Sequence, residues 1–386
     1  MKFKTFTLDS GAKIKYFEKT SIPIVYFSVL IKASSLDEIK PSQAYLTAHL
    51  LTYGTKTRTA RQIEEEIDFL AISIEKRITS DYTIFTLSAT KRHLKEALEL
   101  FFDILKNPIF PKEELEREKT ILYKSIKQLE EDPSYIGQKN FMKQLFGEHP
   151  YGRPVEGEGE TLMEITKEDI VDFYNQFYNP SNMIFSVVGD IDEKLLKEMI
   201  IKPISDWQGI KKERKIKPPF FKVRQKPLKI NINREDLTQS TIILGFEGIS
   251  RKNPDFYTLT LINYVLGGGG LTSRLARSIR EEHGLAYSIY SLFYPYLLSG
   301  SFLIEVKTKA ENTEKVIDMI VKELEKIKEK GITDEEIKEA KSFLVGSFPL
   351  KIDTMKKLAE FLVVVEFYEL GDDYIERYPE YINRIT

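Results

Sequence analysis

The sequence contains no cysteine, which excludes disulfides, thiolate zinc sites, iron–sulfur clusters and a cysteine nucleophile. It has four histidines, His49, His93, His149 and His283, so an imidazole-based metal site has few residues to draw on. It also has no excess of charge of one sign, since 57 Lys and Arg stand against 59 Asp and Glu. This balance gives no electrostatic support for binding to nucleic acid or to an anionic membrane.

Long apolar runs are also missing. The longest, such as Phe361–Phe367, fall far short of the roughly 20 residues that a membrane-spanning helix needs. Residues 1–17 alternate apolar and polar side chains, without the apolar core or cleavage site of a signal peptide. They therefore predict a first strand, in a cytoplasmic protein that does not bind a membrane. A periplasmic location stays open if a leader has been removed from the natural chain.

Apolar and aromatic residues are abundant enough for packed cores. They make up 42% and 12% of the 386 residues, which excludes a wholly disordered chain. At roughly 100–200 residues per domain, this length predicts two or three domains. Charged residues make up 30% of the sequence and are rich in Lys and Glu, a composition typical of heat-adapted proteins.

The most basic stretch of the chain runs from Trp207 to Lys229. It contains Pro218 and Pro219, and nine Lys and Arg lie between Lys211 and Lys229. Two adjacent prolines extend neither a helix nor a central strand. An interdomain linker with solvated charges is favoured over a nucleic-acid-binding arm. The predicted division is an N-terminal domain over 1–210, a linker over 211–226 and a C-terminal domain over 227–386.

The two halves of the chain repeat one order of elements. Each has two strands, then an amphipathic helix, then a second helix that begins with a capping position and two glutamates. The matched segments are 27–34 with 241–248, 83–89 with 301–308, 93–105 with 312–324, and 110–119 with 332–341. Their offsets stay between 214 and 222 residues. This duplication predicts an α+β fold of two tandem homologous domains, each a mixed or antiparallel sheet covered by long helices.

The register of the duplication also shows a difference between the halves. In the first half, residues 166–189 supply a helix and then a strand, whereas the sequence given ends at the matching Thr386. The second domain is therefore expected to lack its final helix and strand. We expect an exposed sheet edge or an apolar groove there, a feature that recruits strands from other chains.

Four stretches carry recognisable motifs. Residues 43–59 contain L-x-x-G-T-x-x-R-T, residues 149–155 read HPYGRPV, and residues 177–189 match F-Y-x-P-x-N-x-x-x-x-V-x-G. Residues 266–291 read LGGGGLTSRLARSIREEHGLAYSIYS. Together they resemble the pitrilysin/insulinase-type zinc peptidases, which include the mitochondrial processing peptidases. The resemblance spans nearly the whole chain and implies that the two domains form facing halves of a peptidase chamber.

The zinc motif of that family, H-x-x-E-H, is degenerate here. Its first histidine aligns with Tyr45 and its glutamate with Ala48, and the second histidine alone is kept, as His49. The third ligand of the family is expected near Lys124 or Ser125. A catalytic zinc site needs three protein ligands and a water activated by a base, so the chain is expected to hold no metal and to cleave no peptide by itself. His49 and Tyr45 are then helix residues satisfied by packing, and His149 opens a structural turn.

A second feature of the family is an Arg and a Tyr seven residues apart, which reach from a non-catalytic subunit to the zinc of its partner. Arg280 and Tyr287 match this pair. A phenol donor supported by a guanidinium stabilises the oxyanion of a tetrahedral peptide intermediate. The alternative is structural, with Arg280 paired to Glu281 or Glu282 and Tyr287 in the core.

The run Gly267, Gly268, Gly269 and Gly270 follows an apolar helix. In the processing peptidases a glycine-rich loop at this place is linked to substrate recognition, and glycine lets a backbone approach a peptide closely. A helix C-terminus with a long turn explains the same residues equally well.

These features favour a non-catalytic subunit of a heterodimeric zinc peptidase. The zinc cofactor is expected in a homologous partner subunit, and an extended peptide is the expected substrate. Two alternatives stay open: a catalytically inactive scaffold subunit, which has no need of an oxyanion donor, and a homodimeric clamp that binds peptides.

Overall fold

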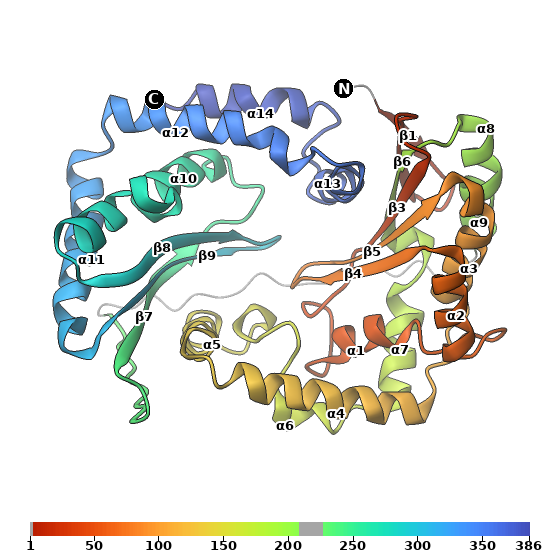
Figure 1. Ribbon diagram of the computed structural model, residues 1–386, viewed down its shortest axis with the longest axis horizontal. Coiled ribbons are helices and arrows are strands. Elements are labelled where there is room, and N and C mark those ends of the chain that lie inside the picture. Colours follow the sequence, from red (N-terminus) through yellow and green to blue (C-terminus); the bar gives the residue numbers. More distant parts are fainter. Residues whose placement is uncertain (1–2, 208–226) are drawn as a thin grey trace. The chain divides into compact units, whose positions relative to one another are not determined.

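The computed structural model describes residues 3–207 and 227–386, so the predicted linker at 211–226 lies outside the described residues. The chain is α+β and forms two compact units (Figure 1). Unit 1 consists of Met1–Gln128, Pro154–Ile216 and Pro349–Glu376. Unit 2 consists of Leu129–Arg153, Lys217–Phe348 and Arg377–Thr386. Within the described residues, no helix is both long enough and apolar enough to cross a membrane.

Unit 1 is built on a six-stranded sheet with the order β1-β2-β6-β3-β5-β4. All neighbours are antiparallel except β2 and β6, which run parallel. The strands are β1 (Lys4–Thr7), β2 (Lys13–Glu18), β3 (Ile24–Ile31), β4 (Ser73–Ile78), β5 (Thr83–Thr90) and β6 (Met183–Gly189).

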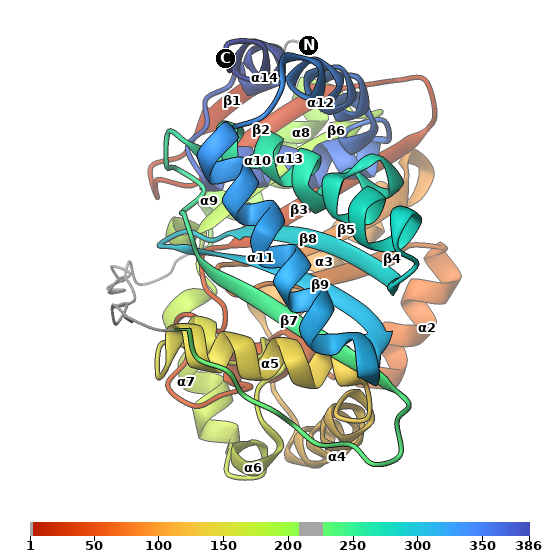
Figure 2. The ribbon, with the colours of Figure 1, turned by 90° about the vertical axis from the view of Figure 1, so that its left-hand side faces the viewer.

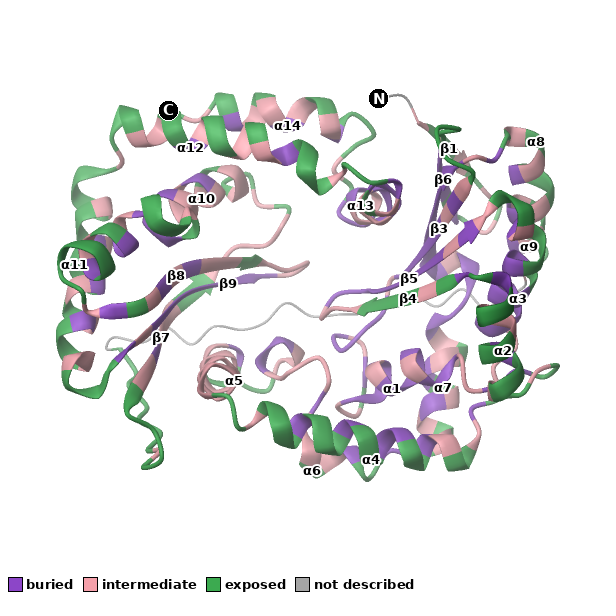
Figure 3. Ribbon diagram, in the orientation of Figure 1, coloured by how far each residue is buried: buried purple, intermediate pink, exposed green. Residues whose placement is uncertain are grey.

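Helices cover both faces of the sheet of unit 1. One face packs on α1, α3 and α7, which share the main hydrophobic core with the strands. The other face packs on α13, whose Leu358 and Leu362 lie against Val188 of β6. Both central strands are therefore almost wholly buried (Figure 3). The helices are α1 (Gln43–Leu50), α2 (Ala60–Leu70), α3 (Leu94–Lys106), α4 (Lys112–Leu129), α6 (Gly159–Leu162), α7 (Lys167–Phe177), α8 (Glu193–Leu196), α9 (Lys202–Ser205) and α13 (Met355–Phe367).

Unit 2 has a three-stranded antiparallel sheet with the order β7-β9-β8 among its described residues. The strands are β7 (Gln239–Gly248), β8 (Ala286–Pro295) and β9 (Gly300–Lys309). Ile242 and Ile304 face a core shared with α11, whereas Ile243 faces α5. Figure 2 shows these two helices beside the strands of unit 2. The helices are α5 (Pro133–Phe146), α10 (Phe256–Asn263), α11 (Thr313–Lys330), α12 (Asp334–Ser347) and α14 (Tyr374–Asn383).

The duplication predicted from the sequence is visible in these elements. The strands expected at 27–34 and 83–89 are β3 and β5, and those expected at 241–248 and 301–308 are β7 and β9. Of the two predicted helix starts, the one in the second half has the expected capping interaction, because Thr333 and Glu336 form a reciprocal capping box before α12. The order β3-β5-β4 in unit 1 is repeated as β7-β9-β8 in unit 2.

Two equivalent helices are exchanged between the halves of the chain. Helices α5 and α13 begin at Pro133 and Met355, an offset of 222 residues (355 − 133) that continues the repeat. The first belongs to unit 2 and the second to unit 1. The predicted division into 1–210 and 227–386 treats each domain as contiguous, and the structure instead gives each unit a segment from the other half.

Close packing explains this exchange. A Cβ on Gly137 of α5 would lie 2.7 Å from the Cγ1 atom of Ile243, so the helix backbone sits directly on β7. On the other side, the Ser186 hydroxyl of β6 donates a 2.5 Å hydrogen bond to the Ala359 carbonyl of α13. Each helix therefore buries one face on a strand that its own half of the chain does not supply.

Candidate functional site

The degenerate motif lies on the short helix α1 of unit 1. Most of this helix is buried, and Ala48 has no exposed surface. Tyr45 and His49 are four residues apart and are only partly buried, because residues at this spacing share one face of a helix. Their rings are stacked, with centroids 4.3 Å apart and an angle of 17° between the ring planes.

His49 is a weak base in this setting. Burial, together with the positive charge of Lys76, lowers the pKa of His49 to about 3. Burial also raises the pKa of Tyr45, and the negative charges of Glu156 and Glu118 add to this effect. At neutral pH the His49 imidazole and the Tyr45 phenol are both uncharged, so the stack joins two neutral rings.

A carboxylate from α4 completes this cluster. Glu118 is 7% exposed, and one of its oxygens lies 3.8 Å from the Nδ1 atom of His49. Because that imidazole is neutral, the contact is not an ion pair. The Tyr53 hydroxyl donates a 2.5 Å hydrogen bond to the other oxygen of Glu118. Burial and this hydrogen bond raise the pKa of Tyr53 to about 12.

The two residues expected near the third ligand position do not reach His49. Lys124 and Ser125 are exposed on α4, and no hydrogen bond or ion pair joins them to His49 in the described part of the chain. The carboxylate that reaches His49 is instead Glu118, which lies six residues before Lys124 on the same helix. The motif alone does not indicate this residue. A usable signal was present, since Glu118 lies between Leu115 and Leu122 on the buried face of α4.

Within the described residues, no group of three or more His, Asp or Glu side chains could hold a metal ion. The cluster has one imidazole and one carboxylate, and Ala48 provides no general base. Lys76 adds a positive charge that affects the pKa of His49. A cation would have to overcome this charge with too few ligands.

The second candidate region is in unit 2, where Arg280 and Tyr287 flank a turn. Arg280 lies in a π-helical segment, Ala276–Glu282, and its side chain is exposed. Tyr287 is 53% exposed and is not part of the core. No ion pair between Arg280 and Glu281 or Glu282 is present in the described residues. The packed arrangement that the sequence left open as an alternative is therefore not the one observed.

A β-bulge explains why Tyr287 points outward. The register of β8 and β9 pairs Ala286 with Thr308 and Ser288 with Lys307, which leaves Tyr287 as the extra residue. Such bulges re-aim side chains and occur often near active sites, and π-helical turns share this tendency. The Thr308 hydroxyl holds the bulge by donating a 2.5 Å hydrogen bond to the Leu285 carbonyl.

Packing accounts for most of the glycine run. A Cβ on Gly267 would lie 2.6 Å from the backbone nitrogen of Ser291, and one on Gly268 would lie 2.6 Å from the side-chain nitrogen of Asn263. A Cβ on Gly269 would approach the Tyr264 carbonyl to 2.8 Å. Gly270 differs, because it has a φ of +65° and open space around it.

The HPYGRP stretch forms a packed turn in unit 2. The Nδ1 atom of His149 accepts a 3.2 Å hydrogen bond from the backbone of Tyr151, which is 1% exposed. The Tyr151 ring stacks on Tyr296 at 4.5 Å. A Cβ on Gly152 would lie 2.5 Å from the carbonyl of Gly147. His149 thus opens a structural turn, as its sequence context predicts.

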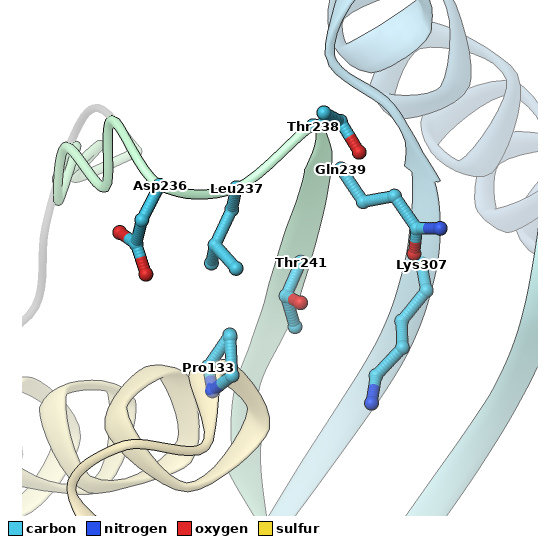
Figure 4. Close-up of a pocket in the computed structure, with 7 residues that line it drawn as sticks. All are labelled: Pro133, Asp236, Leu237, Thr238, Gln239, Thr241 and Lys307. Carbon is cyan, nitrogen blue, oxygen red and sulfur yellow. The ribbon is translucent and has the colours of Figure 1, made fainter.

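Unit 2 also contains a pocket of about 280 Å³ beside the start of β7 (Figure 4). None of the predicted site residues lines it. The lining residues are Pro133, Asp236, Leu237, Thr238, Gln239, Thr241 and Lys307.

This geometry defines a peptidase-like α+β protein whose zinc motif keeps only one of its ligands, His49. Comparison with known families agrees. Residues 14–159 match the family described as "Insulinase (Peptidase family M16)", and residues 164–344 match "Peptidase M16 inactive domain". The chain belongs to peptidase family M16.

Individual relatives cover most of the chain. The "uncharacterized zinc protease YmxG" of Bacillus subtilis is 28% identical over 91% of this chain and 85% of its own length. A zinc protease of Rickettsia bellii is 28% identical over 96% of this chain and 87% of its own length. A solved "peptidase M16 inactive domain" from Pseudomonas fluorescens has a TM-score of 0.90 and 25% identity, covering 100% of this chain and 92% of that one.

A solved protease from Helicobacter pylori has the same fold, with a TM-score of 0.88 and 20% identity over 100% of this chain and 94% of that one. The family implies a zinc ion at the H-x-x-E-H position. The residues present here do not fit it, because Tyr45 and Ala48 supply neither ligand nor base and Glu118 alone joins His49. The chain is thus a peptidase-like member of the family whose described residues do not form the family's zinc site.

Proposed function

We propose that the chain is the non-catalytic subunit of a two-chain zinc peptidase. A homologous partner subunit carries the zinc ion, and this chain supplies Arg280 and Tyr287 to the partner's site. The exposure of this pair supports the proposal. Tyr287 is the extra residue of a bulge and is 53% exposed, although Ala286 and Ile289 of the same strand face a core.

The chemistry of the pair suits peptide hydrolysis. Attack of water on a peptide carbonyl places negative charge on the carbonyl oxygen, and a fixed hydrogen-bond donor lowers the energy of that state. The Tyr287 phenol donates one hydrogen bond to this oxygen. The planar guanidinium of Arg280 supports the phenol or holds a neighbouring carbonyl in a fixed direction. Neither residue needs a metal of its own.

The glycine run has a narrower role in this proposal. Gly267 to Gly269 are required by packing, so Gly270 is the position whose backbone is open to an extended peptide. Its exposed backbone lies on the surface of unit 2. We assign substrate contact to this end of the run and helix termination to the rest.

The test is reconstitution with a homologous subunit that carries H-x-x-E-H. Gel filtration reports complex formation, and a quenched fluorescent peptide reports cleavage. The expected result is a stable pair that cleaves faster than the zinc-bearing subunit alone, while this chain alone cleaves nothing. Formation of a pair without any gain in cleavage would favour the scaffold alternative. Failure to pair, together with self-association, would favour the homodimeric clamp.

A further inference from the structure

A turn that begins with glycine and ends with arginine occurs in both units. Residues 54–58 read GTKTR and residues 270–274 read GLTSR, at an offset of 216 residues (270 − 54) that lies within the range of the repeat. Gly54 and Gly270 both have a positive φ, of +132° and +65°. The two segments are therefore equivalent turns, and their surroundings can be compared directly.

In unit 1 the turn is closed by backbone pairing. Residues 107–111 connect α3 to α4. The Ile109 amide of this connector donates a 3.1 Å hydrogen bond to the Gly54 carbonyl, and Pro108 forms an antiparallel bridge with Thr55. The connector thus lies along the turn as a short extended segment, and Gly54 is buried.

In unit 2 the equivalent turn does not have this pairing. Helix α11 continues to Lys330, so the connector to α12 has only the three residues 331–333. The last residues of α11 bond within their helix and are not free to pair with the turn. Among the described residues, no backbone hydrogen bond or bridge joins 270–272 to 331–333. Gly270 and Leu271 are exposed.

The side chain of Arg274 makes the connection instead. Its Nε and Nη2 atoms donate hydrogen bonds to the two carboxylate oxygens of Glu336 on α12, each at 2.6 Å. Nη2 also donates to the Gly331 carbonyl at 3.2 Å. The side chains of Arg274 and Glu336 are 18% and 23% exposed. A paired contact of this kind fixes the direction of the guanidinium as well as its distance.

The equivalent arginine of unit 1 points to other helices. Arg58 donates from Nε to Glu66 of α2 and from Nη1 to Asp103 of α3, both at 2.9 Å. The matched helices place Lys322 where Asp103 lies, at an offset of 219 (322 − 103). A lysine has no acceptor for a guanidinium. The same turn is therefore tied to α2 and α3 in unit 1 and to α12 in unit 2.

Ser273 carries this attachment to Gly270. Ser273 precedes Arg274 in the chain and is 1% exposed. Its backbone amide and its hydroxyl both donate to the Gly270 carbonyl, at 3.2 and 2.7 Å. The position of Gly270 relative to α12 is thus set through two consecutive residues.

We propose that Arg274 is a positioning residue, which holds the Gly270 turn a side chain's length from the connector 331–333 and keeps the turn available to an extended peptide. In unit 1 the backbone of the connector itself lies beside the turn, so this position suits an extended chain. The inference rests on the proposed function, which assigns substrate contact to Gly270, and it adds the residue that sets this contact. Arg274 acts through the turn and not on the peptide.

The first experiment needs neither partner nor substrate. Hydrogen exchange with mass spectrometry is measured on the full chain and on its Arg274→Ala variant, with circular dichroism to confirm folding. The amides of Gly269, Ser273 and Arg277 are hydrogen-bonded, so loosening of the turn is visible as faster exchange in 269–277. We expect this effect, and we expect exchange in β8 and β9 to stay unchanged.

The second experiment measures cleavage of the quenched fluorescent peptide by the reconstituted pair. Arg274→Ala is expected to raise KM about tenfold and to keep kcat within about twofold, because it disturbs substrate binding and leaves Tyr287 in its bulge. Arg274→Lys is expected to give an intermediate KM. Its ammonium pairs with Glu336 as a point charge but does not reproduce the guanidinium fork that also reaches Gly331.

Arg58→Ala is the matched control. It removes the equivalent arginine of unit 1, whose side chain is 25% exposed and pairs with two carboxylates. This variant is expected to lose thermal stability to a similar degree as Arg274→Ala. Its KM is expected to equal that of the wild type, since Arg58 holds a turn that the connector of unit 1 already covers.

Three outcomes overturn the inference. The first is unchanged exchange in 269–277 of Arg274→Ala, which means that other contacts hold the turn. The second is faster exchange there with an unchanged KM, and the third is an equal rise of KM in Arg58→Ala, which makes the effect a general loss of stability. A wild-type pair that shows no gain in cleavage overturns the proposed function instead, and exchange in the free chain then decides by itself whether Arg274 holds the turn.

Discussion

Tyr45 stacks on His49 with ring centroids 4.3 Å apart, at positions where family M16 places two zinc ligands. Burial disfavours a protonated imidazole at His49, and the positive charge of Lys76 opposes protonation further. At these two positions the structure shows aromatic packing. Its remaining carboxylate, Glu118, is engaged by Tyr53.

The first prediction concerns pH. The pKa of His49 falls from 6.5 in a free side chain to about 3 in the folded chain. The unfolded state then binds one more proton between these pH values, so stability decreases as pH falls below 6.5. At pH 5 this costs up to about 2 kcal/mol relative to pH 7. Urea unfolding at pH 5 and 7 measures the difference, and His49→Phe is expected to reduce it, whereas an unchanged difference would assign the acid sensitivity to other groups.

The second prediction concerns metal. The purified chain is expected to hold no stoichiometric zinc after dialysis, because one imidazole and one carboxylate bind zinc too weakly. Elemental analysis by mass spectrometry measures the metal content. A stoichiometric zinc ion that is lost in a His49→Ala variant would contradict this prediction, since it would show that this residue is a ligand after all.

The third prediction concerns a buried charge in unit 1. Lys15 is 2% exposed and pairs with Glu366 at 2.6 Å and with Asp372. Lys15→Met leaves these carboxylates without their buried partner and is expected to destabilise the protein by about 2–4 kcal/mol. Lys13→Met is the matched control, because Lys13 pairs with the same Glu366 but is 46% exposed, and its cost is expected to stay below about 1 kcal/mol. Equal losses in denaturant unfolding would contradict the role of burial.

The fourth prediction separates packing from flexibility in the glycine run. Gly267→Ala places a methyl group 2.6 Å from the Ser291 backbone, and a loss of about 2–3 kcal/mol is expected. Gly346→Ala is the control, since Gly346 lies within α12 with open space around it. That change is expected to stabilise the protein by about 0.5–1 kcal/mol. Thermal unfolding checks both, and a neutral Gly267→Ala would show that the turn is mobile.

The order of elements could be read from the sequence because it depends on local patterns. Alternation over 83–89 and 301–308 marks strands, and a capping threonine before α12 marks a helix start. The exchange of α5 and α13 could not, because nothing in the sequence of either helix indicates which sheet it packs on. The choice depends on close contacts such as that of Gly137 with Ile243, which have no local signature.

The site was predictable to a similar extent. The loss of ligands at Tyr45 and Ala48 follows from the motif alone. The bulge that exposes Tyr287 depends on the register of β8 against β9, and the approach of Glu118 to His49 depends on how α4 packs on α1. The bulge and the approach of Glu118 both depend on contacts between residues far apart in the sequence. Local sequence patterns therefore do not predict them.

The last prediction tests the proposed mechanism. Tyr287→Phe removes one hydroxyl from an exposed side chain, so folding and pairing with a zinc-bearing subunit are expected to stay unchanged. The loss is expected in kcat, by about 10²–10³-fold, because the hydrogen bond strengthens only as charge develops on the oxyanion. Arg280→Lys is expected to lower kcat and raise KM together, since an ammonium does not reproduce the planar guanidinium fork.

Steady-state cleavage of a quenched peptide by the reconstituted pair measures both constants. Tyr294→Phe is the matched control, because Tyr294 is on the same strand and is 38% exposed, yet lies seven residues beyond the bulge. It is expected to cleave at the wild-type rate. If the Tyr287→Phe pair also cleaves at that rate while its complex stays intact, the bulge serves packing between subunits. The scaffold function would then explain the exposed pair better than oxyanion stabilisation does.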